Sequence, residues 1–381
     1  MDQSPQTIPH ASVVAAMDAA LAAARSGVRG SNPLVGAAVI APDGTIITGH
    51  HAGAGTPHAE PTAIRAARSA GIDLTSSTLC VTLEPCSHHG RTPPCTDLIL
   101  ETGIPEVVLA SADPNPAAAG GAQRLREAGV RVTTGVREDQ AIDLNARWLT
   151  AVGERRPFVT LKIAQSLDGR IAAADGTSQW ITSPASRARV HALRARVDAV
   201  VVGTGTARAD DPRLTARLTA EAGTPPGAGQ TAEVGISSEP GRTPPTGSPP
   251  HTQPVPVVVG LQDLDPHSHL AQDPRTVHLR TRDPREALED LKARGIDHVL
   301  VEGGAQLAGA LVRADLVDEL ELHIAPLLLG DGLTGLADLG ITTLADGIRW
   351  VSDPVEPLSD SAPNPDTLLR LSPTPAPTKG S

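Results

Sequence analysis

Aromatic side chains are nearly absent from this chain of 381 residues, which has one Phe, three Trp and no Tyr. Ala, Val, Leu and Ile must therefore fill most of the core. Cysteine is also scarce, with three residues at Cys80, Cys86 and Cys95. Disulfide-stabilised proteins are usually short, secreted and richer in cysteine. This composition argues against a disulfide scaffold and leaves the three thiols for other chemistry.

Positive charge is in deficit, since Lys and Arg number 32 against 43 Asp and Glu, for a net charge of −11. Proteins that bind nucleic acids normally present a basic surface, so we expect no nucleic-acid partner. No apolar run approaches the roughly 18 residues of a membrane span, and the N-terminus lacks the features of a signal peptide. We expect a soluble cytoplasmic protein without a membrane partner.

Strand-like and helix-like segments alternate along the chain, which is long enough for two domains. In the first half the pattern predicts helices at 12–25, 60–71, 95–103 and 122–129, a hairpin at 36–50 with a turn at Asp43-Gly44, and strands at 77–85, 106–114 and 130–135. In the second half it predicts strands at 158–166, 198–203, 255–260, 298–304 and 319–326, and helices at 285–295 and 305–313. Such alternation indicates α/β domains with largely parallel strands.

Composition also suggests where the domains begin and end. We expect a first domain at 11–150 and a second at 157–372, joined by a linker around 152–156, with flexible tails at 1–10 and 373–381. The segment 218–254 is rich in Pro, Gly, Ser and Thr. Such a segment cannot pack a core and is predicted to be an insertion in the second domain.

Three residues with metal-binding side chains fall at the ends of predicted elements. His58 and Glu60 stand at the start of a predicted helix, Cys86 follows a strand, and Cys95 opens the next helix. One imidazole and two thiolates would give Zn²⁺ three ligands and leave a fourth position for water. Zinc lowers the pKa of that water to about 7, and Glu60 could carry its proton to departing ammonia. The sequence therefore predicts a zinc-dependent deaminase with Glu60 as its catalytic carboxyl.

The two cysteines are spaced more widely than in the generic deaminase pattern, as Cys86-SHHGRTPP-Cys95. In an alternative interpretation both are small buried apolar residues and His58 merely caps a helix. The combination of all three favours zinc. Cys80, in the middle of a strand, is predicted to be a core residue. His88 and His89 could be alternative ligands, although their loop is better suited to contact substrate.

At this point the motifs resemble a known family. The segments NPLVG (32–36), PHAE (57–60) and TLEPCSHHGRTPPCTD (82–97) are similar to the bifunctional deaminase–reductase of riboflavin biosynthesis. The resemblance continues in LKIAQSLDGRIA (161–172), SQWITSP (178–184), GTGTARADDPRLT (203–215) and LVEGGAQLAGAL (300–311). It covers nearly the whole chain outside the 218–254 insertion.

The resemblance implies an α/β fold, with a cytidine-deaminase-like three-layer α/β/α domain followed by a dihydrofolate-reductase-like α/β domain. It implies zinc-dependent hydrolytic deamination of 2,5-diamino-6-(5-phosphoribosylamino)pyrimidin-4(3H)-one, a phosphorylated pyrimidine. NADPH-dependent reduction of the ribosyl side chain would then give 5-amino-6-(5-phosphoribitylamino)uracil. It also implies a homodimer or higher homo-oligomer.

Matching positions carry the family's site residues onto this chain. For the zinc site they imply the ligands His58, Cys86 and Cys95. For NADPH they imply Ala164, Trp180, Thr206, Asp210, Gly304, Ala305, Gln306, Leu307, Ala308, Gly309 and Ala310. For substrate they imply Asn32, His51, His88 and Arg91 in the deaminase half, and Lys162, Ser178, Arg194, Leu214, Arg217 and Glu302 in the reductase half. Independently of the family, a strand followed by Gly303-Gly304 and a helix N-terminus could bind a phosphate, or could be only a turn needed for packing.

The second half departs from the family pattern, because Pro256 and Gly260 stand where charged residues are usual. One alternative is therefore an active deaminase fused to an inactive reductase-like domain. Another is a nucleic-acid base deaminase, which the net charge of −11 disfavours. A third is a non-catalytic scaffold stabilised by zinc.

Overall fold

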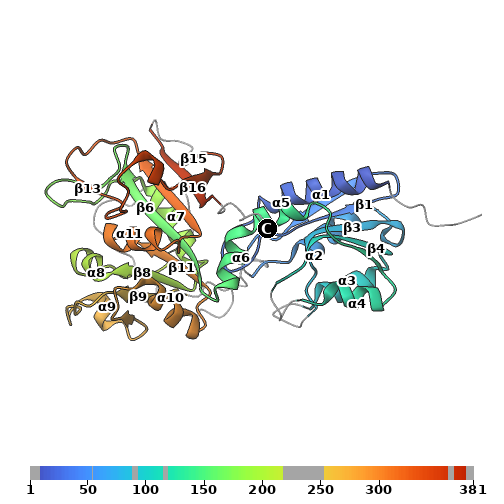
Figure 1. The fold of residues 1–381 in the computed structure, drawn as a ribbon, viewed down its shortest axis with the longest axis horizontal. Helices are drawn as coiled ribbons and strands as arrows, with labels where there is room; N and C mark the ends of the chain where they lie inside the picture. Colours follow the sequence, from blue (N-terminus) through green and yellow to red (C-terminus); the bar gives the residue numbers. More distant parts are fainter. Residues whose placement is uncertain are drawn as a thin grey trace, which may run out of the picture.

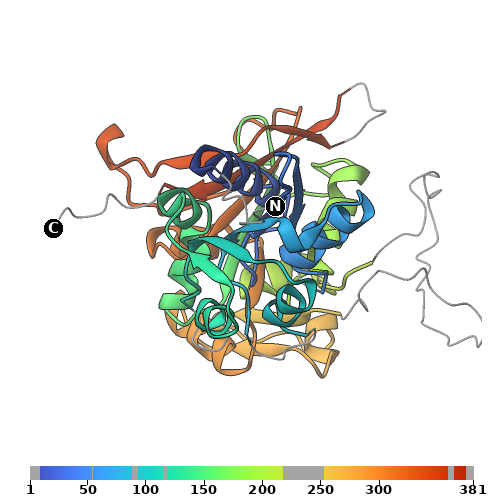
Figure 2. The ribbon, with the colours of Figure 1, turned by 90° about the vertical axis from the view of Figure 1, so that its right-hand side faces the viewer.

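The computed structural model of the protein describes residues 9–53, 55–87, 93–114, 119–217, 253–358 and 364–374. They form two lobes, each built on its own sheet (Figure 1). Viewed along the long axis, the N-terminal lobe lies in front of the C-terminal one (Figure 2). None of the helices described is long and apolar enough to cross a membrane. His88, Arg91, most of the expected insertion and most of both expected tails lie outside the described residues.

The first sheet has the order β2-β1-β3-β4-β5. Its strands are β1 (Gly36–Ile40), β2 (Ile46–His50), β3 (Thr78–Leu83), β4 (Glu106–Ser111) and β5 (Arg131–Thr133). β3, β4 and β5 are parallel, whereas β1 runs antiparallel to both β2 and β3. The hairpin predicted at 36–50 is confirmed, since a short turn can only return the chain antiparallel. The expectation of largely parallel strands holds for β3, β4 and β5 but is wrong for the pairing of β1 with β3.

Helices cover both faces of this sheet. α1 (His10–Ala24) and α5 (Glu138–Leu144) pack on one face, where Met17, Ile40 and Ala141 share a core. α2 (Ala59–Ser69), α3 (Cys95–Thr102) and α4 (Gly121–Glu127) pack on the other, together with the short helix η1 (Leu74–Ser76). Gly71 and Gly103 follow α2 and α3 with φ of 75° and 73°, the left-handed conformation that ends a helix. The predicted three-layer α/β/α arrangement is confirmed.

The second sheet is nine-stranded over the residues described, with the order β10-β9-β8-β11-β6-β12-β16-β14 and with β15 paired to β16. The strands from β10 to β12 are parallel, and β16 with its neighbours β14 and β15 closes the edge antiparallel. Its strands are β6 (Phe158–Ser166), β8 (Ala199–Gly203), β9 (Val255–Val259), β10 (Val277–Leu279), β11 (His298–Glu302), β12 (Glu319–Ala325), β14 (Trp350–Ser352), β15 (Glu356–Leu358) and β16 (Asp366–Pro373).

The remaining elements of this lobe are helical or belong to a small separate two-stranded sheet. They are α7 (Pro184–Arg194), α8 (Thr204–Asp210), α9 (His269–Gln272), α10 (Pro284–Ala293), α11 (Ala305–Arg313), η2 (Leu344–Asp346), β7 (Arg170–Ala172) and β13 (Leu333–Thr334). Leu288 of α10 and Leu311 of α11 pack on one face of the sheet. Leu193 of α7 packs on the other, against Val200 and Leu300.

The C-terminal part of the sheet was missed by the sequence patterns. β16 pairs with β12 from Thr367 to Leu371 and continues to Pro373, which lies opposite Trp350 of β14. Pro373 therefore belongs to a strand, not to the flexible tail expected from its Pro-rich surroundings. The position tolerates proline because β12 no longer pairs there and requires no N–H.

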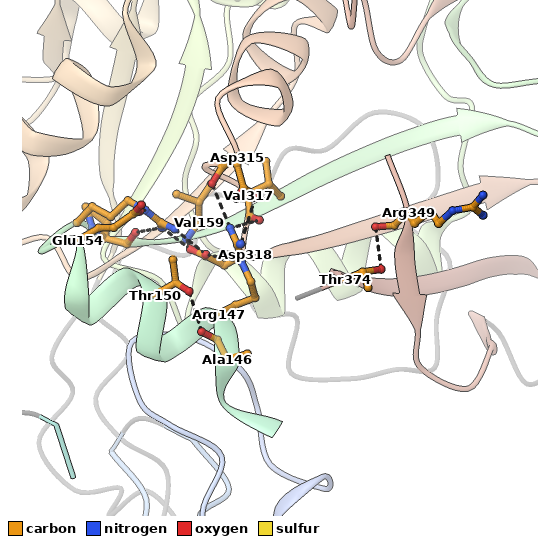
Figure 3. A network of polar contacts seen from close by, with 12 residues as sticks. Ala146, Arg147, Thr150, Glu154, Val159, Asp315, Val317, Asp318, Arg349 and Thr374 are labelled. Atoms are coloured by element: carbon orange, nitrogen blue, oxygen red, sulfur yellow. Dashed lines mark hydrogen bonds and ion pairs between the residues drawn. The ribbon is translucent and has the colours of Figure 1, made fainter. Parts of the chain in front are cut away.

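The segment expected to be a linker is exposed at 153–155, but the buried Arg156 at its end anchors it as a fixed junction between the two halves. α6 (Ala146–Gly153) leads into Arg156, whose Nη1 and Nη2 donate to Asp318 at 2.6 and 2.9 Å. Arg147 of α6 donates to the same carboxylate at 3.2 Å, and so does the Val159 N–H at 2.8 Å (Figure 3). Asp318 has 0 % exposure and Arg156 has 4 %. The junction is fixed because a buried carboxylate must keep its partners.

We expect Asp318→Asn to lower the free energy of unfolding by about 3 kcal/mol, because it leaves two arginine side chains near the junction without their shared charge. Urea denaturation followed by the fluorescence of Trp148, which lies buried in α6, would measure the change. Asp315→Asn is the matched control, since this 76 % exposed side chain also pairs with Arg147. A loss for Asp315→Asn as large as for Asp318→Asn would contradict the prediction.

Candidate functional site

The three predicted zinc ligands converge at one edge of the first sheet. His58 precedes α2, Cys86 follows β3, and Cys95 is the first residue of α3. His58 Nδ1 lies 3.3 Å from Cys95 Sγ and 3.7 Å from Cys86 Sγ, and all three ligand atoms lie within 4.8 Å of one another. Such separations suit atoms that share one tetrahedral ion at bond lengths of about 2.0–2.3 Å. Among the residues described, no other trio of potential ligands is grouped in this way.

Local contacts favour negative charge on the thiols. Hydrogen bonds from the Cys95 thiol and from His58 lower the pKa of Cys86 to about 4. The Cys95 backbone N–H, at the N-terminus of α3, also donates to Cys86 Sγ at 3.3 Å. The shared proton and burial raise the pKa of Cys95 in turn. A bound cation would remove this asymmetry, because both cysteines bind metal as thiolates.

Glu60 lies in the first turn of α2, two residues from His58, with 3 % exposure. Burial raises the pKa of its carboxyl. A raised pKa brings a carboxyl closer to the range in which general acid–base catalysis is efficient. Glu60 thus lies buried close to the three ligands, with its pKa above the ordinary value.

Asn32 and His51 extend the cluster on the side of His58. His51 Nδ1 lies 3.1 Å from the Pro57 carbonyl oxygen, which can only accept, so this nitrogen carries the proton. The other ring nitrogen then accepts from the Asn32 amide at 3.3 Å. Burial lowers the pKa of His51, which keeps its ring neutral. The rings of His51 and His58 meet edge to face at 5.4 Å. The structure thus brings Asn32, His51 and His58 together.

Glu84 is a residue of this region that the sequence patterns did not single out. Its carboxylate accepts from the Ala122 N–H at 2.8 Å and from the Asp113 N–H at 3.2 Å. Glu84 follows β3 and directly precedes Pro85 and Cys86. Its two hydrogen bonds therefore connect this part of the chain to the start of α4 and to the segment after β4. The only signal in the sequence is its position immediately before the Pro-Cys pair.

In the second sheet, strand register brings Lys162 between two carboxylates. Lys162 of β6 lies opposite Glu302 of β11 and Glu321 of β12. Arg194 of α7 donates to both oxygens of Glu302, at 2.6 and 2.9 Å. Burial opposes the charge on Glu302, but Arg194 and Lys162 hold its pKa below the usual value. Burial lowers the pKa of Lys162. Lys162, Arg194 and Glu302 therefore form one polar cluster.

The start of α8, directly after β8, meets the short loop after β11 beside this cluster. Gly303 and Gly304 have φ of 89° and 83°, and a Cβ on either would lie 3.1–3.2 Å from the Thr206 side chain. Glycine is needed here both for the left-handed backbone and for the approach of Thr206. Thr206, Gly304 and Ala305 at the start of α11 are thereby brought together. This end of a parallel sheet is where α/β folds usually bind ligands.

Several other residues predicted to contact NADPH or substrate are buried in the protein core or lie on its surface. Leu214 and Ala308 are each 2 % exposed within the core, so only their backbones could face a ligand. Gly309 packs against the 337 backbone, since a Cβ there would lie 1.9 Å from the Ala337 oxygen. Trp180 is 68 % exposed beneath the Arg187 guanidinium. The remaining predicted contacts are exposed or partly buried: Ala164, Ser178, Asp210, Arg217, Gln306, Leu307 and Ala310.

Comparisons with known proteins find relatives of both halves of the chain. A family model described as the cytidine and deoxycytidylate deaminase zinc-binding region matches residues 11–111, and one described as the RibD C-terminal domain matches 157–352. The riboflavin biosynthesis protein RibD of Mycobacterium tuberculosis H37Rv is 41% identical over 342 residues, covering 89% of this chain and 90% of that protein. The Escherichia coli K12 protein of the same name is 39% identical over 346 residues, covering 84% and 89%.

Solved structures extend this similarity to the whole fold. The diaminohydroxyphosphoribosylaminopyrimidine deaminase/5-amino-6-(5-phosphoribosylamino)uracil reductase of Thermotoga maritima is 32% identical with a TM-score of 0.64, covering 96% of this chain and 99% of that chain. Acinetobacter baumannii RibD is 32% identical with a TM-score of 0.66 and the same coverage. Sequence and fold are therefore similar over both halves.

The three cysteines provide an internal test of the zinc site. We expect Cys86→Ala and Cys95→Ala each to abolish tight zinc binding, because each removes one of three protein ligands. Cys80→Ala should keep about one zinc ion per chain, since Cys80 is buried in β3 and faces α1. Metal analysis of the purified variants after dialysis would measure this. Full zinc content in Cys86→Ala, or its loss in Cys80→Ala, would contradict the assignment.

Proposed function

Because this chain belongs to the RibD family of riboflavin biosynthesis proteins, which are bifunctional deaminases and reductases, we propose how its residues divide the two reactions. Residues 11–150 would form the deaminase domain and residues 157–372 the reductase domain. The first would hydrolyse the 2-amino group of 2,5-diamino-6-(5-phosphoribosylamino)pyrimidin-4(3H)-one. The second would reduce the ribosyl side chain of the product to give 5-amino-6-(5-phosphoribitylamino)uracil.

In the deaminase, His58, Cys86 and Cys95 would hold Zn²⁺, and their donor atoms and separations fit that ion. When bound, zinc supplies a water molecule whose pKa lies near 7. The Glu60 carboxylate would accept the proton of the attacking water and pass it to the departing amino group, which leaves as ammonia. The observation that carries this proposal is the buried Glu60 carboxyl beside the only grouped ligands of the described chain.

Substrate orientation in the deaminase would fall to Asn32 and His51, together with His88 and Arg91. The protonated Nδ1 of His51 is engaged with Pro57 O, and its Nε2 with Asn32. Asn32 therefore has its amide oxygen available for a pyrimidine N–H, while its NH₂ group is held by His51. This arrangement would fix the ring of the substrate relative to Glu60.

In the reductase, the polar cluster of Lys162, Arg194 and Glu302 would hold the phosphoribosyl substrate, with Ser178, Leu214 and Arg217 around it. NADPH, which supplies the reducing equivalents, would lie along Thr206, Asp210 and the loop that opens α11, in contact with Ala164 and Trp180. Residues 304–310 present the N-terminus of α11, whose N–H groups attract phosphate. Gly260 lies close to the start of α8, and a larger residue would not fit there, since an added Cβ would lie 2.7 Å from Thr204 Oγ1.

We further propose that the protein acts in the cytoplasm on this small molecule, without a nucleic-acid or membrane partner. Its net charge of −11 opposes nucleic-acid binding, and thiolate ligands are kept reduced in that compartment.

A homo-oligomer formed through the reductase domain would cover its exposed Leu328, Leu333, Leu344, Val351 and Val355. We expect sedimentation to give at least twice the chain mass of 39.1 kDa; a single-chain mass at assay concentration would contradict this.

Two variants of the full-length enzyme separate the reactions and serve as controls for each other. Glu60→Gln should retain zinc yet slow ammonia release about 10³-fold, while leaving NADPH oxidation on 5-amino-6-(5-phosphoribosylamino)uracil unchanged. Lys162→Met should slow NADPH oxidation about 100-fold and leave ammonia release unchanged. Normal deamination by Glu60→Gln would exclude Glu60 as the proton carrier. A wild-type protein that never oxidises NADPH would instead support a reductase domain without activity.

A further inference from the structure

The loop that carries Asn32, residues 27–35, lies between the two halves of the molecule. Arg29 of this loop reaches the reductase half, where its Nη1 and Nη2 donate to the two oxygens of Asp353 at 2.5 and 3.2 Å. The same Nη1 lies 4.0 Å from Glu319, which is almost fully buried. Arg29 and Asp353 side chains are 24% and 27% exposed, so their ion pair is partly shielded from water and stronger than one in full solvent.

A second contact with the reductase half follows directly in the sequence. Gly30 is buried against the His298 ring, where an added Cβ would lie 2.8 Å from Nδ1. The ring cannot easily move away, because His298 is 4 % exposed and its Nε2 is hydrogen-bonded to Thr160 Oγ1 at 2.9 Å. The backbone of the loop therefore rests directly on the first residue of β11.

On its other side the loop is held by α6 and the residue before it. Trp148 Nε1 donates to the Ser31 carbonyl at 3.1 Å. The Asn145 side chain accepts from the Leu34 N–H at 2.8 Å and donates to the Leu34 carbonyl at 3.0 Å. Since Arg147 attaches α6 to Asp318, this side of the loop also depends on the reductase half.

The far end of the loop reaches the zinc cluster. Asn32 donates to His51, and His51 lies against His58. A displacement of the loop would therefore move Asn32 and remove its hydrogen bond to His51. The loop itself contains neither Glu60 nor any of the three ligands.

We propose that Arg29 is a positioning residue for the deaminase: paired with Asp353 of the reductase half, it fixes the 27–35 loop so that Asn32 meets the pyrimidine substrate. The inference rests on the proposed role of Asn32 as a substrate contact. It makes the reductase half part of the deaminase site, through one ion pair and one glycine contact. Loss of the ion pair weakens substrate binding in the deaminase and leaves the reductase untouched.

Asp353→Asn in the full-length, zinc-loaded enzyme tests this, since it keeps the shape of the side chain and removes its charge. We expect the KM for ammonia release to rise about tenfold, with kcat nearly unchanged. The KM and kcat of NADPH oxidation on the deaminated substrate, and the zinc content, should stay at their wild-type values. Hydrogen exchange of the amides in the 27–35 loop should become faster.

Further variants identify the contact responsible. Arg29→Met should raise this KM at least as much as Asp353→Asn, since it also removes the contact with Glu319, and the double variant should be no worse than Arg29→Met. Gly30→Ala should produce the same selective rise in KM by pushing the loop from His298. Asp18→Asn is the matched control: it breaks an Arg–Asp pair with Arg137 on the deaminase surface, and it should leave KM unchanged.

The outcomes separate this inference from the proposed function. If Asn32→Ala raises the KM for ammonia release but Asp353→Asn does not, the positioning role of Arg29 is overturned and the assignment of Asn32 stands. If Asn32→Ala also has no effect, the assignment of Asn32 itself is wrong. If Asp353→Asn lowers both activities and the zinc content together, the ion pair is only structural and the inference fails.

Discussion

A single buried carboxylate, Asp318, holds the two halves of this molecule in their relative positions. It has no exposed surface and accepts from Arg156, Arg147 and the Val159 N–H. Because a buried charge is costly unless it is fully paired, the segments that supply these donors cannot separate from it. They are the end of the deaminase half, the connecting segment and the first strand of the reductase sheet. α6 is thereby fixed, and the side chains that support the 27–35 loop are fixed with it.

The zinc cluster shows how local secondary structure can assemble a site with little help from distant residues. Cys86 lies shortly after the end of β3, His58 directly precedes α2, and Cys95 begins α3, so the ligands meet at one edge of the sheet. Helix N-termini favour negative charge, which suits two thiolates. Glu60 lies in the first turn of α2 and is buried where this helix packs on the sheet.

The reductase cluster depends instead on strand register. Lys162 lies more than a hundred residues before Glu302 and Glu321 in the sequence, and the three are neighbours because β6 lies between β11 and β12 and is parallel to both. A shift of one residue in any of these strands would turn its side chain to the other face. Two arginines of α7 pair with these carboxylates: Arg194 with Glu302 and Arg189 with Glu321.

The sequence by itself determined most strands and helices, such as β6 and α11, whose apolar patterns are local. It also predicted the zinc ligands and Glu60, because their residue types and spacing carry the chemistry, and the structure groups the three ligand atoms within 4.8 Å of one another. Only the tertiary structure decided that Arg156 is buried and anchors the segment between the halves, that Pro373 ends a sheet strand, and that Leu214 and Ala308 face the core. It alone placed Asp353 beside Arg29, 324 residues away. Pairings over such distances depend on how the two halves pack, and no periodicity in a single chain encodes them.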